Sequence, residues 1–251
     1  MITPLDVLRR LRHGARRLSR KRLVDGPLTF AEDGLATQHS TAFLEDPRFV
    51  RAYAAGKATG SWGGADIHWR AQVACWAGAH AARLEGDFVE CGVNRGGLAR
   101  AIIEFVGAEA FRSRRFYLLD TFHGLVEAQI SDEDRAMGRR EGGYEECYDA
   151  VVDTFRPFPF VEVVRGTVPD TLPRVTSERI SFLSIDMNCV PPEIAAAEAF
   201  WPRLVRGAVV LLDDYNFVEH QPQRVAFDAF ARARDVVVLP MPTGQGILLK
   251  P

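Results

Sequence analysis

The stretch Gly86-Asp-Phe-Val-Glu-Cys-Gly-Val-Asn-Arg-Gly-Gly97 decides the fold of this chain. Its first half, residues 87–91, is a short apolar run bounded by turn residues, which is typical of a buried strand. Its glycines then permit a tight turn, and the apolar residues of the stretch 98–106 recur at helical spacing. A strand, a glycine turn and a helix in this order are the geometry of a nucleotide site.

The residue types in this turn favour some ligands over others. The spacing Gly-x-x-x-Gly-Gly differs from the Gly-x-Gly-x-x-Gly that brings a backbone against a pyrophosphate, so a nicotinamide oxidoreductase is disfavoured. Glu90 at the strand end would repel a diphosphate, but it suits a ligand with a cationic head and free hydroxyls, such as S-adenosylmethionine. Glycine-rich turns of this kind also occur in α/β proteins that bind no ligand.

Apolar strand-like runs alternate with helical stretches after the glycine turn. This alternation predicts an α/β, Rossmann-like, doubly wound and mainly parallel sheet, with residues 246–250 as an edge or antiparallel strand near the carboxyl terminus. The other expected strands cover residues 115–120, 160–165, 180–186, 208–213 and 236–240.

The chain before this region has a different character. We expect residues 1–64 to form a basic arm with a helical extension, and residues 65–251 to form one enzyme domain. Residues 4–23 could form a basic amphipathic helix that contacts an anionic membrane surface or packs on a partner subunit of a homo-oligomer. Helices are expected over residues 41–55 and 67–84, with residues 60–66 as a mobile loop.

Composition and charge limit the possible partners and the compartment. Residues 1–26 carry eight Lys or Arg and two Asp, a net charge of +6, so the total of −2 leaves −8 for the remainder. An acidic body argues against a nucleic-acid groove. Four widely spaced cysteines favour a reduced setting over a disulfide framework. With no apolar run near the roughly 20 residues of a membrane span, we expect a cytoplasmic protein.

Acidic residues follow several of the predicted strands. Asp120 stands where a carboxylate binds the hydroxyls of a ribose in such folds, although a helix cap is the alternative. Asp186, Asp213 and Asp214 should meet at one edge of the sheet, where three like charges favour a divalent cation such as Mg²⁺ unless each caps a helix separately. The long connection that follows Asp120, residues 121–143, could be a lid.

Four motifs in this order resemble the macrocin O-methyltransferase family of macrolide-sugar O-methyltransferases. They are Val89-Glu-Cys-Gly-Val-Asn-Arg-Gly-Gly97, Tyr117-Leu-Leu-Asp-Thr-Phe-His-Gly-Leu125, Arg165-Gly-Thr-Val-Pro-Asp-Thr-Leu-Pro173 and Val210-Leu-Leu-Asp-Asp-Tyr215. The resemblance runs from about residue 65 to the carboxyl terminus. It implies a class I methyltransferase that uses S-adenosylmethionine and Mg²⁺ to methylate a sugar hydroxyl of a glycosylated natural product or polysaccharide precursor.

The resemblance also implies roles for individual residues. Asp186, Asp213 and Asp214 would hold the metal, with Asp186 as general base. Apart from the resemblance, their positions in the chain make His123, Tyr144 and His220 candidate substrate contacts, and either histidine could be a base; a surface role for the histidines and a core role for Tyr144 are the alternatives. The cofactor would be bound by Glu90, Gly92, Asn94, Arg95, Gly96, Asp120, Thr121, Phe122, Gly166 and Thr167.

One departure from the family pattern concerns the metal site. The family continues Asp-x-Asp-Leu-Tyr, whereas this chain reads Asp186-Met-Asn-Cys-Val, so Asn188 keeps an oxygen but loses a charge. Two alternatives to a sugar O-methyltransferase remain at this point. One is a catechol or phenol O-methyltransferase, because a phenol needs less activation, and the other is a non-catalytic scaffold that binds S-adenosylmethionine.

Overall fold

A mainly parallel sheet of seven strands forms the centre of the computed structural model, which describes residues 27–251. The predicted basic helix over residues 4–23 lies outside the described residues. The strand order is β10 (Leu239–Pro240), β11 (Gly246–Leu249), β9 (Leu204–Leu212), β8 (Ile180–Ile185), β3 (Asp87–Cys91), β4 (Phe116–Asp120) and β7 (Val161–Arg165). The predicted doubly wound sheet is therefore confirmed, and β11 is antiparallel to β9. β11 is not at the edge, because β10 pairs with its other side.

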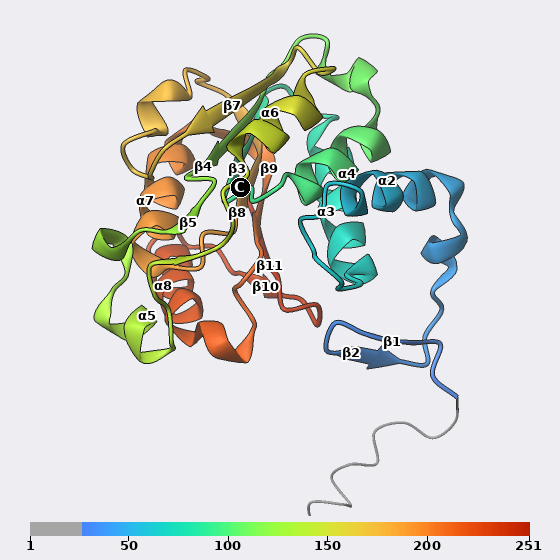
Figure 1. Ribbon diagram of the computed structural model, residues 1–251, viewed down its shortest axis with the longest axis horizontal. Helices are drawn as coiled ribbons and strands as arrows, with labels where there is room; N and C mark the ends of the chain where they lie inside the picture. The colour runs from blue at the N-terminus through green and yellow to red at the C-terminus, as the bar shows by residue number, and fades with distance from the viewer. Residues whose placement is uncertain (1–26) are drawn as a thin grey trace, which may run out of the picture. The chain divides into compact units, whose positions relative to one another are not determined.

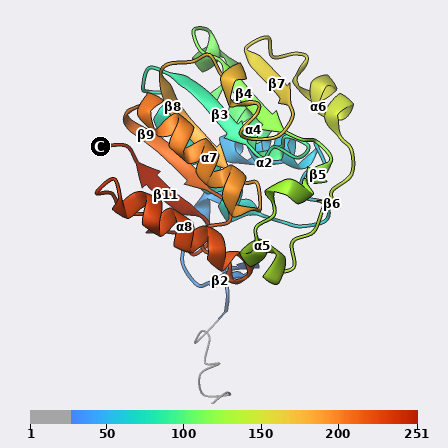
Figure 2. The same ribbon diagram turned by 90° about the vertical axis from the view of Figure 1, so that its left-hand side faces the viewer.

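Helices cover both faces of this sheet (Figure 1). One face carries α3 (His68–Ala81), α4 (Gly97–Val106) and α6 (Tyr148–Phe155), with α2 (Pro47–Lys57) packed on α4. The other face carries α7 (Val190–Phe200) and α8 (Gln221–Arg232), which lie in front of the sheet in Figure 2. Single turns of 3₁₀ helix connect these elements: η1 (Ala42–Glu45), η2 (Ala108–Phe111), η4 (Leu172–Arg174), η5 (Trp201–Arg203) and η6 (Val218–His220).

The core lies on both faces of the central strands. Phe88 of β3 packs with aromatic rings beneath α3 and α4, whereas Val89 and Cys91 join the cluster under α7 and α8. Strands that bury both faces read as continuous apolar runs, which is the pattern of a parallel sheet. Phe200, at the end of α7, is fully buried and so serves packing. This two-sided burial fixes the strand ends that carry the polar residues.

Residues 121–143, which we call the lid, contain several short elements. They are β5 (Gly124–Leu125), η3 (Glu127–Gln129), α5 (Asp132–Ala136) and β6 (Gly142–Gly143). β5 and β6 pair antiparallel at the base, where a Cβ on Gly124 would lie 2.3 Å from the Gly142 carbonyl oxygen. The predicted lid is thus a folded segment closed at its base by glycine-to-glycine contact.

The chain divides into two compact units after Ala42. The described part of the first unit contains a hairpin of β1 (Phe30–Glu32) and β2 (Leu35–Thr37), which the sequence analysis did not predict. Its turn, Asp33-Gly34, has positive φ at both residues, as a tight hairpin turn requires. Residues 43–64 belong to the second unit, Phe43–Pro251.

Two further expectations concern chemistry and membranes. All four cysteines are buried and free, so they form no disulfide framework. Within residues 27–251, every helix is too short or too polar to cross a lipid bilayer.

Candidate active site

The parallel strands end at the same edge of the sheet, and polar residues stand at or just after these ends. Hydrogen bonds continue the ladder just past the strands: Gly92 donates to the Leu119 carbonyl, Asp186 to that of Cys91, and Asp213 to that of Ile185. The turn after β3 is unusually close to the neighbouring strand end. Gly92 has φ +87°, and a Cβ there would lie 1.8 Å from the Asp186 carbonyl oxygen. Only glycine fits this position.

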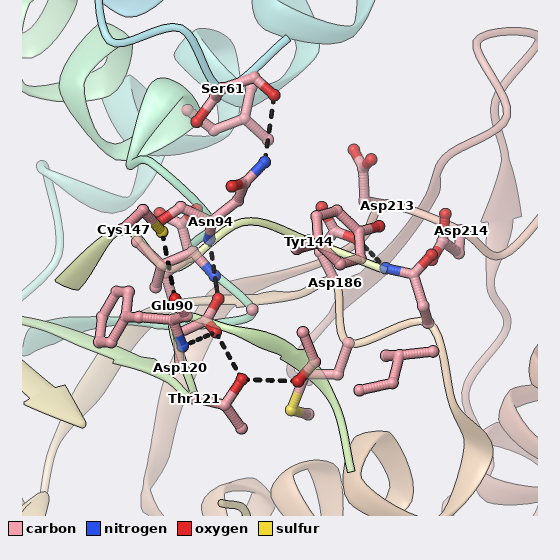
Figure 3. A pocket seen from close by; sticks show the side chains of 18 of the residues that line it. Ser61, Glu90, Asn94, Asp120, Thr121, Tyr144, Cys147, Asp186, Asp213 and Asp214 are labelled. Atoms are coloured by element: carbon pink, nitrogen blue, oxygen red, sulfur yellow. Dashed lines mark hydrogen bonds between the residues drawn. The ribbon is translucent and has the colours of Figure 1, made fainter. Parts of the chain in front are cut away.

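A cavity of about 350 Å³ opens beyond these strand ends. It lies where the strand order reverses, between β3 and β8, which is the usual ligand position in open α/β sheets. Most of the predicted cofactor and metal residues line it: Glu90, Gly92, Asn94, Asp120, Thr121, Phe122, Gly166, Asp186, Asp213 and Asp214. Figure 3 shows Glu90 and Asp120 on one side of this cavity and the three other aspartates on the opposite side.

Asp120 organises the glycine turn. Its Oδ2 accepts hydrogen bonds from the backbone N–H groups of Val93 at 2.6 Å and Asn94 at 2.7 Å. Its Oδ1 accepts one from Phe122 at 2.6 Å. The carboxylate therefore fixes the turn after β3 against the start of the lid, instead of capping a helix. Oδ1 also accepts the Thr121 hydroxyl at 3.3 Å, so each oxygen of this cavity-lining carboxylate already accepts two hydrogen bonds within the protein.

Glu90 is a buried carboxyl group that lacks a protein partner on one oxygen. It is 2% exposed, and its Oε2 accepts no hydrogen bond from residues 27–251. Burial, followed by repulsion from Asp213 and Asp120, raises the pKa of Glu90 well above its usual value. A buried oxygen of this kind is costly unless a ligand pairs with it. A cationic or hydrogen-bond-donating group of a ligand in the cavity would satisfy it.

Asp186, Asp213 and Asp214 come together as the sequence predicted. Each offers an oxygen within 4.8 Å of the others. Burial and mutual repulsion raise the pKa of Asp186 well above its usual value, and burial raises that of Asp213. Asp214 Oδ2 is buried and receives no aligned hydrogen bond from the described residues. Three oxygens of this type fit a hard divalent cation, which would remove the repulsion.

Sequence analysis missed three residues around this acidic cluster. Arg70 of α3 donates to Asp213 Oδ2 at 3.1 Å, and Gln245 donates to Asp213 Oδ1 at 2.8 Å. Glu193 of α7 is buried and accepts a hydrogen bond from the Met187 N–H at 3.2 Å. Burial and nearby Asp214 raise the pKa of Glu193 well above its usual value. Their positions depend on contacts across 32 to 143 residues for the Asp213 partners, which no local pattern reveals.

The loop before α3 forms another unpredicted wall. Residues 58–66, which we call the Ser61 loop, place the Ser61 hydroxyl to accept the Gly97 N–H at 2.9 Å. The Ser61 carbonyl accepts the Asn94 side-chain N–H at 3.1 Å, and Trp62 packs on Gly97. Ser61 thus caps the amino terminus of α4 from 36 residues away, because the residue before that helix, Gly96, has no side chain. The composition predicted a mobile loop, and these hydrogen bonds attach it to Asn94 and to Gly97 at the start of α4.

The candidate substrate residues differ in their positions. His123 and Tyr144 line the cavity, and Tyr144 lies beside the acidic cluster in Figure 3. Burial, followed by Asp186 and Asp214, raises the pKa of Tyr144 to about 12, so its phenol stays protonated near neutral pH. His220 lies outside the lining, and its Nδ1 is 3.2 Å from Asp214 Oδ2.

Three predicted cofactor residues also lie outside the lining. Arg95 turns to the surface, where it pairs with Glu145 at 3.0 Å. Gly96 backs onto the Phe155 ring, which a Cβ would meet at 2.4 Å. The Thr167 hydroxyl donates to Asp170 at 2.7 Å, so it closes its own turn. The sequence motif places these residues near the cavity, but their side chains or backbones serve neighbouring contacts.

The strand order, the glycine turn and the polar rim of the cavity together define a class I methyltransferase fold. Comparison with known families identifies the branch: residues 69–242 match the family model of macrocin-O-methyltransferase (TylF), so the chain belongs to this family. The O-methyltransferase structure named NovP has the same fold, with a TM-score of 0.62 and 22% identity over 72% of this chain and 79% of that chain.

Two relatives match part of the chain. An 8-demethyl-8-(2,3-dimethoxy-alpha-L-rhamnosyl)-tetracenomycin-C 4'-O-methyltransferase of Streptomyces olivaceus is 28% identical over 140 residues, covering 53% of this chain and 54% of the relative. A mycinamicin III 3''-O-methyltransferase of Micromonospora griseorubida is 29% identical over 147 residues, covering 53% and 56%. The chain therefore spans little more than half the length of these relatives.

Proposed function

We propose that the chain transfers a methyl group from S-adenosylmethionine to a sugar hydroxyl of a glycosylated natural product, assisted by a divalent cation. The observation that carries this proposal is the pairing of two features across one cavity. Glu90 presents an unpaired buried oxygen on one side, and three aspartate oxygens within 4.8 Å of one another lie on the other. The names of the relatives, which include a rhamnosyl acceptor, support a sugar as the substrate.

The donor half of the cavity fits S-adenosylmethionine. Its amino and sulfonium groups are cations that suit Glu90, whose Oε2 has no protein partner, and its ribose hydroxyls suit Asp120, which lines the cavity. The Ser61 loop and Asn94 close the wall beside the glycine turn. These residues would bind and orient the donor in the half of the cavity opposite the acidic cluster.

The acceptor half has to activate a hydroxyl that is a poor nucleophile. Asp186, Asp213 and Asp214 would hold the cation. When bound, a divalent cation supplies Lewis acidity that lowers the pKa of a hydroxyl beside it. Asp186 is the member of the cluster most exposed to the cavity, so it accepts the proton. Arg70 and Gln245 hold both oxygens of Asp213 in place. The remaining rate enhancement would come from alignment of the acceptor oxygen, the methyl carbon and the sulfur.

Calorimetry with S-adenosylmethionine and with NAD, each with and without Mg²⁺, tests which cofactor the chain binds. We expect S-adenosylmethionine to bind and NAD to give no heat of binding. The E90Q variant should bind S-adenosylmethionine roughly 10- to 100-fold more weakly, because a charge-assisted hydrogen bond contributes about 1.5–3 kcal/mol. E145Q is the matched control, since Glu145 is exposed at the surface and pairs with Arg95. Tight NAD binding, or equal losses in the two variants, contradicts the assignment.

At one Mg²⁺ concentration, set from the Kd at pH 8 and used at both pH values, cation binding should stabilise the protein more at pH 8 than at pH 6. The pKa values of Asp186, Asp213 and Glu193 are raised in the folded chain, so without a cation their contribution to stability is present below the unfolded pKa and is lost as pH rises through the folded values. Bound Mg²⁺ would offset the repulsion among these carboxylates once they have lost their protons. At 100 times Kd it should add about 2.7 kcal/mol, measured as a rise in Tm.

The matched variants for this effect are D214N and D170N. D214N should lose the Mg²⁺ response, because it removes a cluster oxygen. D170N should keep it, because Asp170 pairs with Thr167 at the surface. A response that is equal at both pH values, or that survives in D214N, contradicts the proposed cation site.

A further inference from the structure

One of the five tyrosines has a side chain that no neighbouring residue holds in place. The hydroxyls of Tyr53, Tyr117 and Tyr215 make hydrogen bonds. The ring of Tyr148 packs against another aromatic ring and an arginine. Tyr144, in contrast, makes neither a side-chain hydrogen bond nor a contact with a ring or a cation in the part of the chain that the structure describes. Its ring is therefore available to a ligand.

The backbone on both sides of Tyr144 is nevertheless anchored. Before it, Gly142 and Gly143 form β6 and pair with β5. Their φ values of +76° and +89° are conformations that glycine adopts readily, so the chain turns here without a steric cost. After it, the Cys147 N–H donates to the Phe122 carbonyl oxygen at 2.9 Å. An anchored residue with an unpartnered side chain is preorganised to contact a ligand.

The Tyr144 ring stands at the opening of the cavity, beside the acidic cluster. The residue lines the cavity and is still 46% exposed, so its ring borders both the cavity and the solvent. Figure 3 shows it next to Asp186, whose charge also acts on the Tyr144 phenol. The lining nearby is apolar at Leu125, which pairs with Gly142, and at Met187, which follows Asp186. An aromatic and apolar surface thus adjoins the proposed base.

We propose that Tyr144 is a specificity-determining residue whose ring stacks on one face of the acceptor's pyranose ring and holds the sugar beside Asp186. This inference rests on the proposed function, in which the acceptor is a sugar. The face of an aromatic ring carries partial negative charge, and the C–H bonds of a sugar ring are polarised positively by the neighbouring oxygens, so the two surfaces attract. The hydroxyls of a stacked pyranose project from its rim, where Asp186 can accept a proton.

Two other roles of Tyr144 predict different results. If its hydroxyl contacted the sugar through a hydrogen bond, phenylalanine would be a poor replacement. If its bulk alone excluded water from the cavity, leucine would be a good replacement. Y144F keeps the ring without the hydroxyl, and Y144L keeps apolar bulk without the ring. These two variants therefore separate stacking from both alternatives.

Titration of the full-length protein with methyl β-D-glucopyranoside and with methyl α-L-rhamnopyranoside, followed by saturation-transfer NMR, measures the affinity for a sugar ring. The wild-type chain should bind at least one of these glycosides, and Y144F should keep that affinity. Y144L should bind it about 3- to 10-fold more weakly, the range expected for one lost ring contact. Equal affinities in all three proteins, an equal loss in Y144F and Y144L, or no glycoside binding to the wild-type chain overturns the stacking.

M137A is the matched control. Met137 is another exposed apolar side chain of the lid region, 38% exposed, and it lies outside the lining of the cavity. M137A should bind the glycosides as the wild-type chain does, and a loss as large as that of Y144L would show that the effect is not specific to the ring. Every variant should keep the wild-type Tm, because replacement of Tyr144 removes no specific contact within the protein.

Calorimetry with S-adenosylmethionine separates this inference from the proposed function. Y144F and Y144L should bind S-adenosylmethionine with wild-type affinity, because Tyr144 lies beside the acidic cluster and Glu90 lies on the opposite side of the cavity. Binding of S-adenosylmethionine together with full glycoside affinity in Y144L overturns the stacking alone. A wild-type chain that binds no S-adenosylmethionine, but loses glycoside affinity in Y144L and keeps it in Y144F, refutes the methyl transfer and supports the sugar contact.

Discussion

Replacement of Asp186 with asparagine should lower kcat for methyl transfer by about 10²- to 10⁴-fold, the range expected when a general base is removed. The substitution keeps the volume of the side chain, so the fold and the donor half of the cavity should be retained. Asp186 borders the cavity directly after β8, and the pKa of its carboxyl is raised by burial and by Asp213 and Asp214 when no cation is present. Single-turnover rates and calorimetry with S-adenosylmethionine measure the two properties separately.

A titration with Mg²⁺ distinguishes a base from a simple cation ligand. If Asp186 accepts the proton, saturating Mg²⁺ leaves the D186N rate low, whereas recovery of the wild-type rate would falsify the assignment. N188D is the informative companion variant, because it adds a carboxylate two residues away, where the family pattern has an aspartate. Asn188 lies 3.4 Å from Asp186 Oδ1 through its amide nitrogen. N188D should bind Mg²⁺ more tightly than the wild-type chain while keeping its activity.

Replacement of Gly92 with alanine should destabilise the protein by more than about 4 kcal/mol, which is exceptional for a single substitution. The added Cβ would lie 1.8 Å from the Asp186 carbonyl oxygen and 2.4 Å from its carbon, in a backbone conformation with φ +87°. Both atoms belong to the main chain of the adjacent β8 connection and cannot rotate away. Urea unfolding, or loss of soluble protein, measures the effect.

Gly107 provides the control for this substitution. It also has a positive φ, +91°, but an added Cβ would meet no atom within 4 Å. G107A should therefore cost only the backbone strain, of order 1–3 kcal/mol. The difference between the two variants isolates the clash at the strand ends. Equal losses in stability would show that Gly92 and Asp186 are not in close contact.

The sequence predicted most of the sheet because its information is local. The apolar runs of β3, β4 and β8 are buried on both faces, so each is recognisable without knowledge of its neighbours. The convergence of Asp186, Asp213 and Asp214 also followed from the sequence, since parallel strands bring their carboxyl ends to the same edge. β10 was predicted over residues 236–240 but contains only Leu239–Pro240, because it pairs with β11 at the sheet edge over two residues.

The parts that were missed depend on contacts between distant residues. Ser61 caps α4, and Arg70 reaches Asp213, through pairings that no spacing in the chain encodes. Glu193 lies in the first turn of α7, and only the folded structure shows that its carboxyl is buried and accepts the Met187 N–H. The hairpin turn at Asp33-Gly34 is different, because this dipeptide is itself a local signal that was available.

The Ser61 loop could be replaced by the corresponding loop of another member of the family. The family match begins at residue 69, yet Ser61 and Trp62 form one wall of the donor half of the cavity. One wall of the cavity therefore lies outside the segment that matches the family, although it belongs to the same compact unit as the sheet. Grafting residues 58–66 from another member of the family should change the affinity for bulkier sulfonium analogues without altering the strands of the sheet.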